Sequence, residues 1–363
     1  MTNSVYIHIP FCANICTYCS FCKFFYNEKM VSDYLNSLER EILDTYKGET
    51  LQTLYIGGGT PSSLTLDELK RLFEILKVFK LSDTCEFTIE VNPENIDLDK
   101  LKLFKENKVN RLSMGVESTL KNNLEYLGRC HDFNLVKEKI NLIKSVGITN
   151  INVDLIYALK NQSLKDLETD INNILSLDIT HISTYSLMIE EHTKLYIKKE
   201  TNISEELDYL MYNLIRNKLK EHGFNHYEVS NFSKTGYESK HNLVYWNNEH
   251  YYGFGLSASS YIKNVRKTNT SSFNDYLKGN YVKEKEILNE KDILSYALIL
   301  GFRKITGINK QEFLDKYKVD ILSLYNIKDL IKEKKLVNDL DNIYISYDKI
   351  YIENSILINF VGD

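Results

Sequence analysis

Three closely spaced cysteines near the start of the chain constrain its fold and chemistry most. Cys12, Cys16 and Cys19 form a CxxxCxxC pattern. Three thiolates can hold three corners of a cubic iron–sulfur cluster and leave the fourth iron open to a small ligand. A cluster held by four cysteines is coordinatively full and suits electron transfer, whereas an open iron can chelate a ligand and pass an electron into it. The pattern therefore predicts a reactive 4Fe-4S cluster.

Two other uses of these cysteines are weaker. Cys22 could complete a tetrahedral zinc site, but zinc ligands usually come as two short-spaced pairs separated by a longer loop. The 6 cysteines among 363 residues are too sparse for a secreted disulfide scaffold. Met1 to Ser4 lead directly into a strand-like run, with no basic, apolar or cleavable signal. We therefore expect a reduced, cytoplasmic protein in which Cys22 is a spare thiol near the site.

Composition excludes two classes of partner. A net charge of -5 and a pI near 6.0 lack the basic footprint of a nucleic-acid binder. No apolar stretch approaches the roughly 18 residues that read as a membrane span, so no integral membrane segment is expected. The length allows one large core plus a smaller appended unit.

Strand-like runs alternate with amphipathic helices along the first half of the chain. Six β–α units predict a parallel sheet with helices outside, and the cysteine-bearing first loop favours an open barrel. Motifs at the carboxyl ends of the strands would then meet in one site. The first helix has an expected buried stripe of Val31, Tyr34, Leu35, Leu38, Ile42 and Leu43, and the second opens with a capping box at Thr65 and Glu68. The expected strands are Val5–Ile9, Thr53–Ile56, Glu86–Asn92, Arg111–Val116, Asn150–Tyr157 and His181–Met188.

Three consecutive glycines, at positions 57 to 59, follow the second expected strand. They let the backbone approach a ligand and adopt positive φ, and Pro61 restricts Thr60. Alone, this run fits an ordinary tight turn equally well, and Glu90 at the end of the next strand fits a solvated charge. One strand after CxxxCxxC, however, the run resembles the loop of radical S-adenosylmethionine (SAM) enzymes that hydrogen-bonds the methionine amino group. CxxxCxxC itself resembles the signature of that superfamily.

Further motifs occur in the order of one radical SAM family over nearly the full length. Tyr6–Cys12, Asn110–Val116, Leu127–Arg129, Asp154–Tyr157 and His181–Leu187 resemble the oxygen-independent coproporphyrinogen III oxidases, and Tyr227–Phe232 with His241–Trp246 resembles their heme chaperone branch. The resemblance implies an α/β fold, a partial (β/α)6 radical SAM barrel with a small C-terminal helical, winged-helix-like domain. It implies a core at 1–230, a connecting region with a heme-contact loop at 231–288 and the C-terminal domain at 289–363.

The resemblance also implies a SAM pocket. Arg129 can clamp a carboxylate, and Asp154 can accept from hydroxyls or an amine, although both would otherwise fit an ordinary ion pair at strand ends. Glu117 stands where the family usually has Gln, which replaces a donor and acceptor by an acceptor only. The expected SAM contacts are Tyr6, Tyr18, Gly58, Gly59, Thr60, Glu90, Glu117, Arg129 and Asp154.

A heme site is expected in the connecting region. His241 provides an imidazole beside the flat apolar surfaces of Tyr245 and Trp246, although the same run fits an aromatic loop packed under the barrel. With the resemblance, heme binding is the better interpretation, and it implies an unidentified heme acceptor protein and an electron donor for the cluster. The alternative is an oxidase that decarboxylates two propionates of coproporphyrinogen III. The oxidases of this family carry an N-terminal extension before the cysteine motif. Only 11 residues precede Cys12 here, and this short start favours the chaperone interpretation.

The last part of the chain is expected to be mainly helical. Periodic helices at Ile293–Phe302 and Ile327–Leu336 precede two short strands at Ile343–Ser346 and Ile350–Glu353. The polar stretch Thr268–Asn274 is expected to join this unit to the barrel.

Overall fold

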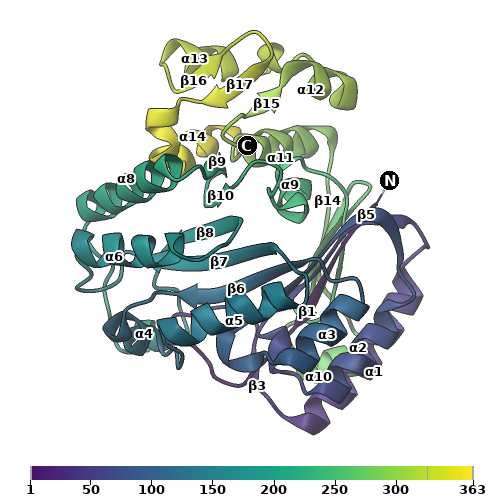
Figure 1. Cartoon of the computed structure of the whole chain (residues 1–363). Helices are drawn as coiled ribbons and strands as arrows, with labels where there is room; N and C mark the ends of the chain where they lie inside the picture. The colour runs from purple at the N-terminus through teal and green to yellow at the C-terminus, as the bar shows by residue number, and fades with distance from the viewer. Residues whose placement is uncertain (1, 325, 362–363) are drawn as a thin grey trace.

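The computed structural model describes residues 2–324 and 326–361. Its centre is a nine-stranded sheet in the order β11-β1-β4-β5-β6-β7-β8-β10-β9 (Figure 1). Six of these strands, β1 and β4 to β8, run parallel and lie in chain order. The expected partial barrel is therefore confirmed. These strands are β1 Ser4–Ile9, β4 Thr50–Gly58, β5 Lys80–Val91, β6 Arg111–Glu117, β7 Asn150–Tyr157 and β8 His181–Ser186.

Helices cover the outer face of this sheet (Figure 1). Val31, Leu35 and Leu38 of the first helix are buried as expected, and the second helix begins with the expected capping box. The prediction for Leu43 is wrong: its side chain is 61% exposed, because it lies about 100° around the helix from Ile42, outside the stripe. The helices are α1 Glu28–Thr45, α2 Leu66–Leu76, α3 Leu98–Glu106, α4 Lys121–Leu127, α5 Phe133–Ser145, α6 Leu164–Leu175, α7 Lys194–Ile197 and α8 Glu205–Glu221.

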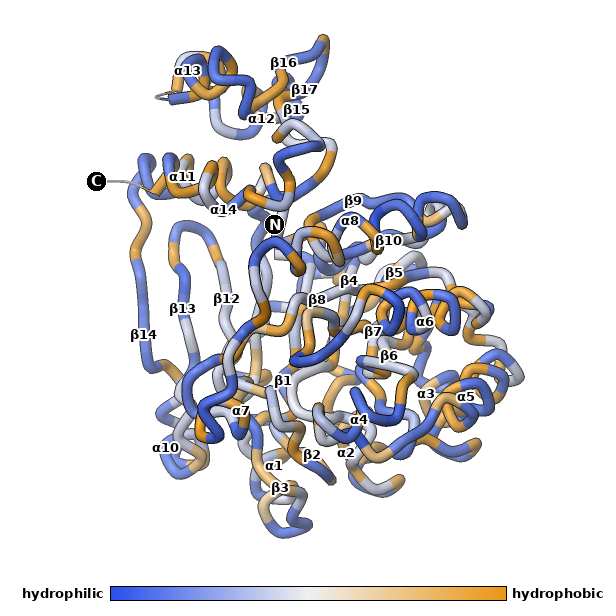
Figure 2. Tube along the Cα trace, turned by 90° about the vertical axis from the view of Figure 1, so that its left-hand side faces the viewer, coloured by the Kyte–Doolittle hydropathy of each residue, from blue (hydrophilic) through white to orange (hydrophobic). Residues whose placement is uncertain are grey.

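The region after α8 extends both edges of the sheet. β9 and β10 add antiparallel strands beyond β8, and β11 pairs parallel with β1. A second sheet, β12-β13-β14, lies side by side with this edge and extends between α10 and the C-terminal unit (Figure 2). The elements are β9 Asn225–Glu228, β10 Asn231–Ser233, α9 Lys240–Trp246, β11 Tyr252–Phe254, β12 Ser259–Ile262, β13 Val265–Asn269, α10 Phe273–Leu277 and β14 Val282–Ile287.

The polar stretch Thr268–Asn274 is not the expected link. It includes the end of β13 and the start of α10, and it packs on α1. Asn269 Nδ2 and the Tyr276 hydroxyl donate to Glu41 of α1 over 2.6 and 2.5 Å. Asn269 of this stretch and Tyr276 just after it thus satisfy a buried carboxylate and fasten the connecting region to the barrel.

Helix α9 lies at the amino ends of the parallel strands. The backbone N–H groups of Lys240 and His241 donate to the two carboxylate oxygens of Glu86 over 3.1 and 3.0 Å. Glu86 belongs to β5, whose other end carries Glu90. Because the two residues lie four positions apart on one strand, α9 and the carboxyl ends of the strands are at opposite ends of the barrel.

The C-terminal elements run α11-β15-α12-α13-β16-β17, the order of a winged helix, and a short sheet β15-β17-β16 joins them. The expected helix Ile327–Leu336 ends early, since Lys334 adopts a left-handed φ of 57°. The expected strand Ile350–Glu353 is wrong: this stretch is helical, with Ile350 buried and Glu353 paired to Arg303 at 2.7 Å. The bounds are α11 Glu290–Gly301, β15 Ile308–Asn309, α12 Lys310–Tyr317, α13 Ile327–Lys332, β16 Leu336–Asn338, β17 Asn342–Ile345 and α14 Glu353–Leu357.

Candidate cluster and cofactor site

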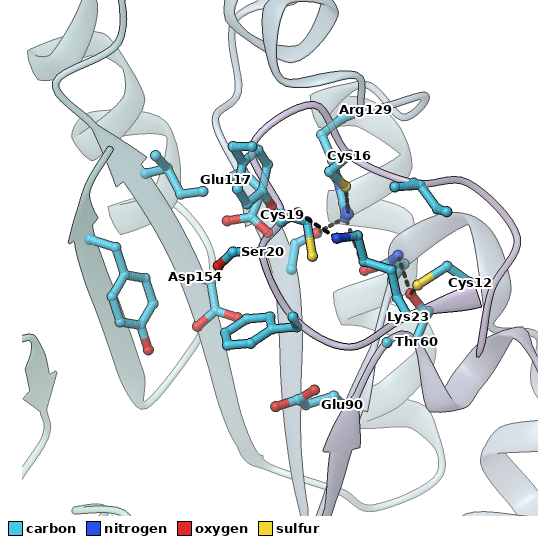
Figure 3. Close-up of a pocket in the computed structure, with 18 of the residues that line it drawn as sticks. Cys12, Cys16, Cys19, Ser20, Lys23, Thr60, Glu90, Glu117, Arg129 and Asp154 are labelled. Atoms are coloured by element: carbon cyan, nitrogen blue, oxygen red, sulfur yellow. Dashed lines mark hydrogen bonds between the residues drawn. The ribbon is translucent and has the colours of Figure 1, made fainter. Parts of the chain in front are cut away.

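A cavity of about 370 Å³ lies at the carboxyl ends of the parallel strands, where barrel active sites form. Its wall combines the cysteine loop after β1 with residues at the ends of β4, β5, β6 and β7. Figure 3 shows the labelled side chains of both groups gathered around one space. The sequence-predicted residues that line it are Cys12, Cys16, Tyr18, Cys19, Gly58, Gly59, Thr60, Glu90, Glu117, Arg129 and Asp154.

The cysteine loop is fixed at several points. Its base is a parallel pair of two-residue strands, β2 Phe11–Cys12 and β3 Phe24–Phe25. In the middle, the Thr17 backbone N–H and hydroxyl donate to the carbonyls at the end of α4 over 3.0 and 2.8 Å. Near its end, His8 Nε2 lies 2.9 Å from the carbonyl oxygen of Cys22. These hydrogen bonds anchor the loop to β1 and α4.

The cysteine sulfurs lie in surroundings that suit iron ligands. Arg129 Nη1 lies 3.4 Å from Cys16 Sγ, and the Thr60 hydroxyl lies 3.6 Å from Cys12 Sγ. Such hydrogen bonds to sulfur tune iron–sulfur clusters. Burial raises the pKa of Cys12 to about 11, so metal binding must displace a proton from this thiol.

The arrangement differs from a compact single-ion site. Within the described residues, no three His, Cys, Asp or Glu side chains stand close enough to hold one metal ion. A cubic cluster instead attaches each of its cysteines to a different iron atom. Cys22 does not line the cavity.

The glycine run allows a close approach between two strands. A Cβ atom on Gly57 would lie 2.7 Å from the Glu90 carboxylate. Gly58 has a φ of +118°, and a Cβ atom there would lie 2.6 Å from the His8 ring. The Gly58 N–H donates to Glu90 Oε2 over 2.9 Å. The run is therefore required for the Glu90 side chain to reach the cavity wall.

Glu90 has capacity for a further donor. Its two oxygens accept from the Tyr55 hydroxyl at 2.8 Å and from the Gly58 N–H, while a carboxylate offers about four acceptor positions. Burial raises the pKa of Glu90 to about 7. A ligand amine would stabilise its ionised form.

Arg129 brings a guanidinium to the cavity wall, which Lys23 also lines. Its Nη2 atom donates to Asn92 Oδ1 over 3.0 Å and to the Gly115 carbonyl, and its buried Nε has no hydrogen-bond partner. A planar guanidinium with an unused donor suits a carboxylate. Asn92 also donates to the Thr60 hydroxyl over 3.3 Å. Sequence reasoning gave Asn92 no role, although a polar residue between a strand end and Pro93 was a usable signal.

Glu117 reaches the cavity through an irregular strand. The register between β6 and β7 shifts between Gly115 and Glu117, and Glu117 has a left-handed φ of 66°. A bulge of this kind re-aims a side chain at the end of a strand. Burial raises the pKa of Glu117 to about 7 and also raises that of Asp154. With Glu90, these acids give the cavity an acidic wall that suits a ligand carrying positive charge.

Comparison with known proteins identifies the family. The sequence model of the Radical SAM superfamily matches residues 6–174. The chain is 38% identical to the heme chaperone HemW of Bacillus subtilis (strain 168) and covers 99% of both chains. It is 36% identical to HemW of Lactococcus lactis subsp. lactis (strain IL1403), over 99% of this chain and 98% of the relative. The chain belongs to the HemW family. Membership of the radical SAM superfamily implies a 4Fe-4S cluster and SAM.

A solved structure supports the fold assignment for this HemW family member. The coproporphyrinogen III oxidase HemN from Escherichia coli superposes with a TM-score of 0.85 at 21% identity, covering 99% of this chain and 90% of that one. This likeness confirms the fold. Among the residues described for this chain, no helix is both long and apolar enough to cross a bilayer.

Four predicted contact residues lie away from the cavity: Tyr6, His241, Tyr245 and Trp246. The Tyr6 hydroxyl lies 3.0 Å from His8 Nδ1, so Tyr6 supports a residue under the loop. His241 is 1% exposed, and its Nδ1 and Nε2 lie 2.7 Å from the Thr53 hydroxyl and 2.8 Å from the Tyr245 hydroxyl. Both ring nitrogens have hydrogen-bond partners and the ring is buried, so His241 is not accessible to a heme iron in this conformation. A heme site at α9 stays a prediction.

Proposed function

We propose that this protein binds heme for transfer to an acceptor protein, and that its cavity holds a 4Fe-4S cluster with exchangeable SAM. The observation that carries the proposal is the full-length relationship, at 38% identity, to a heme chaperone of the HemW family. The cluster would supply one-electron chemistry toward SAM and would require an external electron donor.

The residues of the cavity have distinct proposed roles. Cys12, Cys16 and Cys19 hold the cluster and leave one iron for the ligand. Glu90 accepts from the ligand amine, and the free donor of Arg129 binds its carboxylate. The remaining predicted contacts, Tyr18, Gly58, Gly59, Thr60, Glu117 and Asp154, complete the wall around the ligand.

We place the heme contact at α9, where His241, Tyr245 and Trp246 form the run shared with the chaperone branch. Burial lowers the pKa of His241 to about 3, so the imidazole is neutral and keeps a lone pair for iron. In the described conformation Nε2 shares its hydrogen bond with Tyr245, so iron coordination requires α9 to shift and this bond to break. Trp246 is partly exposed and can meet a porphyrin face without such a change.

The test is a heme titration of purified protein followed by the Soret band. The wild type should bind about one heme per chain through one axial imidazole. His241→Ala should change the band position and weaken binding, and Trp246→Ala should weaken binding with the axial ligand retained. His222→Ala, an exposed histidine at the end of α8, is the matched control and should behave as wild type. Heme binding that is indifferent to both α9 substitutions would move the site elsewhere on the molecule.

A further inference from the structure

One strand connects the two ends of the barrel. The inward-facing side of β4 presents Thr53, Tyr55 and Gly57 in succession, because alternate residues of a strand share a face. Thr53 is hydrogen-bonded to His241 of α9 at the amino end of the barrel. Gly57 gives space to the Glu90 carboxylate at the carboxyl end. Tyr55 lies between these two positions.

Tyr55 contacts both ends directly. Its hydroxyl donates to Glu90 Oε1 over 2.8 Å. Its ring stacks on the His241 ring, with centroids 5.1 Å apart and planes inclined by 28°. The Tyr6 ring also stacks on the Tyr55 ring, with centroids 6.0 Å apart. A side chain of the cofactor cavity and the predicted heme ligand are thus joined through one tyrosine.

The space beside Tyr55 is polar. A second cavity of about 110 Å³ lies between the two ends. Arg111 in its wall is 2% exposed, and its Nε atom has no hydrogen-bond partner. Because Tyr55 lines this cavity, its side chain has open space on one side, and a change at Glu90 can be transmitted as a small shift of Tyr55. The lining residues are Tyr55, Glu90, Arg111, Ser113, Asn152, Asp154, Ser183, Tyr185 and Asn242 of α9.

Helix α9 depends on such tertiary contacts. It has 7 residues, and a helix of this length is not stable in isolation. Its first turn is capped by the Ser239 hydroxyl and the Glu86 carboxylate, and its inner face is held by the contacts of His241. Elements held by few contacts open locally more readily than the rest of a fold. A small change in these contacts therefore changes the stability of α9 measurably.

We propose that Tyr55 is a positioning residue that couples the cofactor cavity to α9, so that a ligand amine bound at Glu90 stabilises the helix that carries His241. The inference rests on the proposed function in naming SAM as the ligand. An N–H donor of the bound amine favours the ionised form of Glu90, and the Tyr55 hydrogen bond becomes charge-assisted and shorter. The ring is then held more firmly against His241. Coupling of this kind is reciprocal: opening α9 weakens SAM binding by the same factor.

The experiment is hydrogen–deuterium exchange on the full chain with its cluster reconstituted, with and without SAM, after equilibrium dialysis has shown that SAM binds. In the wild type, SAM should slow exchange of the α9 amides by about fivefold or more, the lower end of typical coupling. In Tyr55→Phe, SAM should still protect the Gly57–Gly59 loop but not α9. Tyr252→Phe is the matched control, because the Tyr252 hydroxyl also donates to a glutamate, Glu49, at 3.0 Å, and neither residue lines either cavity; it should respond as wild type.

SAM binding without a response of α9 in the wild type, or an unchanged response in Tyr55→Phe, overturns the coupling and leaves the proposed function standing. Failure of SAM to bind the wild type overturns both. A second measurement uses affinity alone: His241→Ala should change the SAM dissociation constant in the wild-type background but not in the Tyr55→Phe background. Equal changes in the two backgrounds would also overturn the coupling.

Discussion

Glu117 stands where its family usually has Gln, and replacing it tests whether this residue belongs to the SAM pocket. The carboxylate is buried, accepts a hydrogen bond from Tyr18 and lies in the field of Arg129. Glu117 is expected to accept from a SAM hydroxyl, so Glu117→Ala leaves that buried donor without its acceptor in the complex, which costs about 1–3 kcal/mol of binding free energy. SAM affinity should therefore fall by about 5- to 150-fold. Glu117→Gln keeps an acceptor oxygen and should cost less than about 1 kcal/mol.

The pH dependence gives this prediction a second readout. Burial raises the pKa of Glu117 to about 7, so the carboxylate is largely protonated at pH 6 and ionised at pH 8. An ionised acid favours a positively charged ligand, so SAM affinity of the wild type should rise between these values. The rise should be smaller in Glu117→Gln, because the amide at position 117 does not titrate.

The assay is equilibrium dialysis of labelled SAM against anaerobically reconstituted protein at pH 6 and pH 8. Glu206→Ala, an exposed position in the first turn of α8, is the control and should match the wild type. Unchanged affinity in Glu117→Ala would place this residue outside the pocket and refute the reasoning.

Two further predictions concern the cluster and the connecting region. Single Cys→Ala changes at Cys12, Cys16 or Cys19 should abolish reconstitution of the 4Fe-4S absorption band, whereas Cys22→Ala should retain it; loss in the latter would show that Cys22 is a ligand. Burial raises the pKa of Glu41 to about 7 from 4.5, so the folded state holds this proton more tightly than the unfolded chain, and stability is lost as pH rises from about 4.5 to 7. Between pH 5 and pH 8, the loss measured by urea unfolding should be smaller in Glu41→Gln than in the wild type by on the order of 3 kcal/mol, because the other buried carboxyl groups act equally in both proteins; equal losses would refute the assignment.

The parallel barrel and the cysteine site were predictable because their signals are local. Each strand of the barrel is a short apolar run, and the three cysteines lie within one loop. Gly58, Thr60 and Glu90 follow the same logic, since parallel strands bring their carboxyl ends together. Residues that end such strands can be assigned to one site without knowledge of the packing.

The features that sequence reasoning missed depend on partners far away in the chain. The polar residues around Asn269 suggested an exposed link between two units. Asn269 is instead buried, because it donates to Glu41, which is 228 residues away in the chain. His241 is enclosed by Thr53 and Tyr245, and no local pattern shows that both of its nitrogens are engaged. Tyr55 reads as one aromatic residue within a strand, and only the fold brings it against Glu90 and His241.

The central claim is that the protein transfers heme and does not convert a porphyrinogen. The most direct measurement incubates reconstituted, heme-loaded protein with an apo-heme acceptor, and separately incubates heme-free protein anaerobically with SAM, reductant and coproporphyrinogen III. The account predicts transfer of heme to the acceptor and no protoporphyrinogen. Formation of protoporphyrinogen over many turnovers, with no transfer of heme, would contradict it.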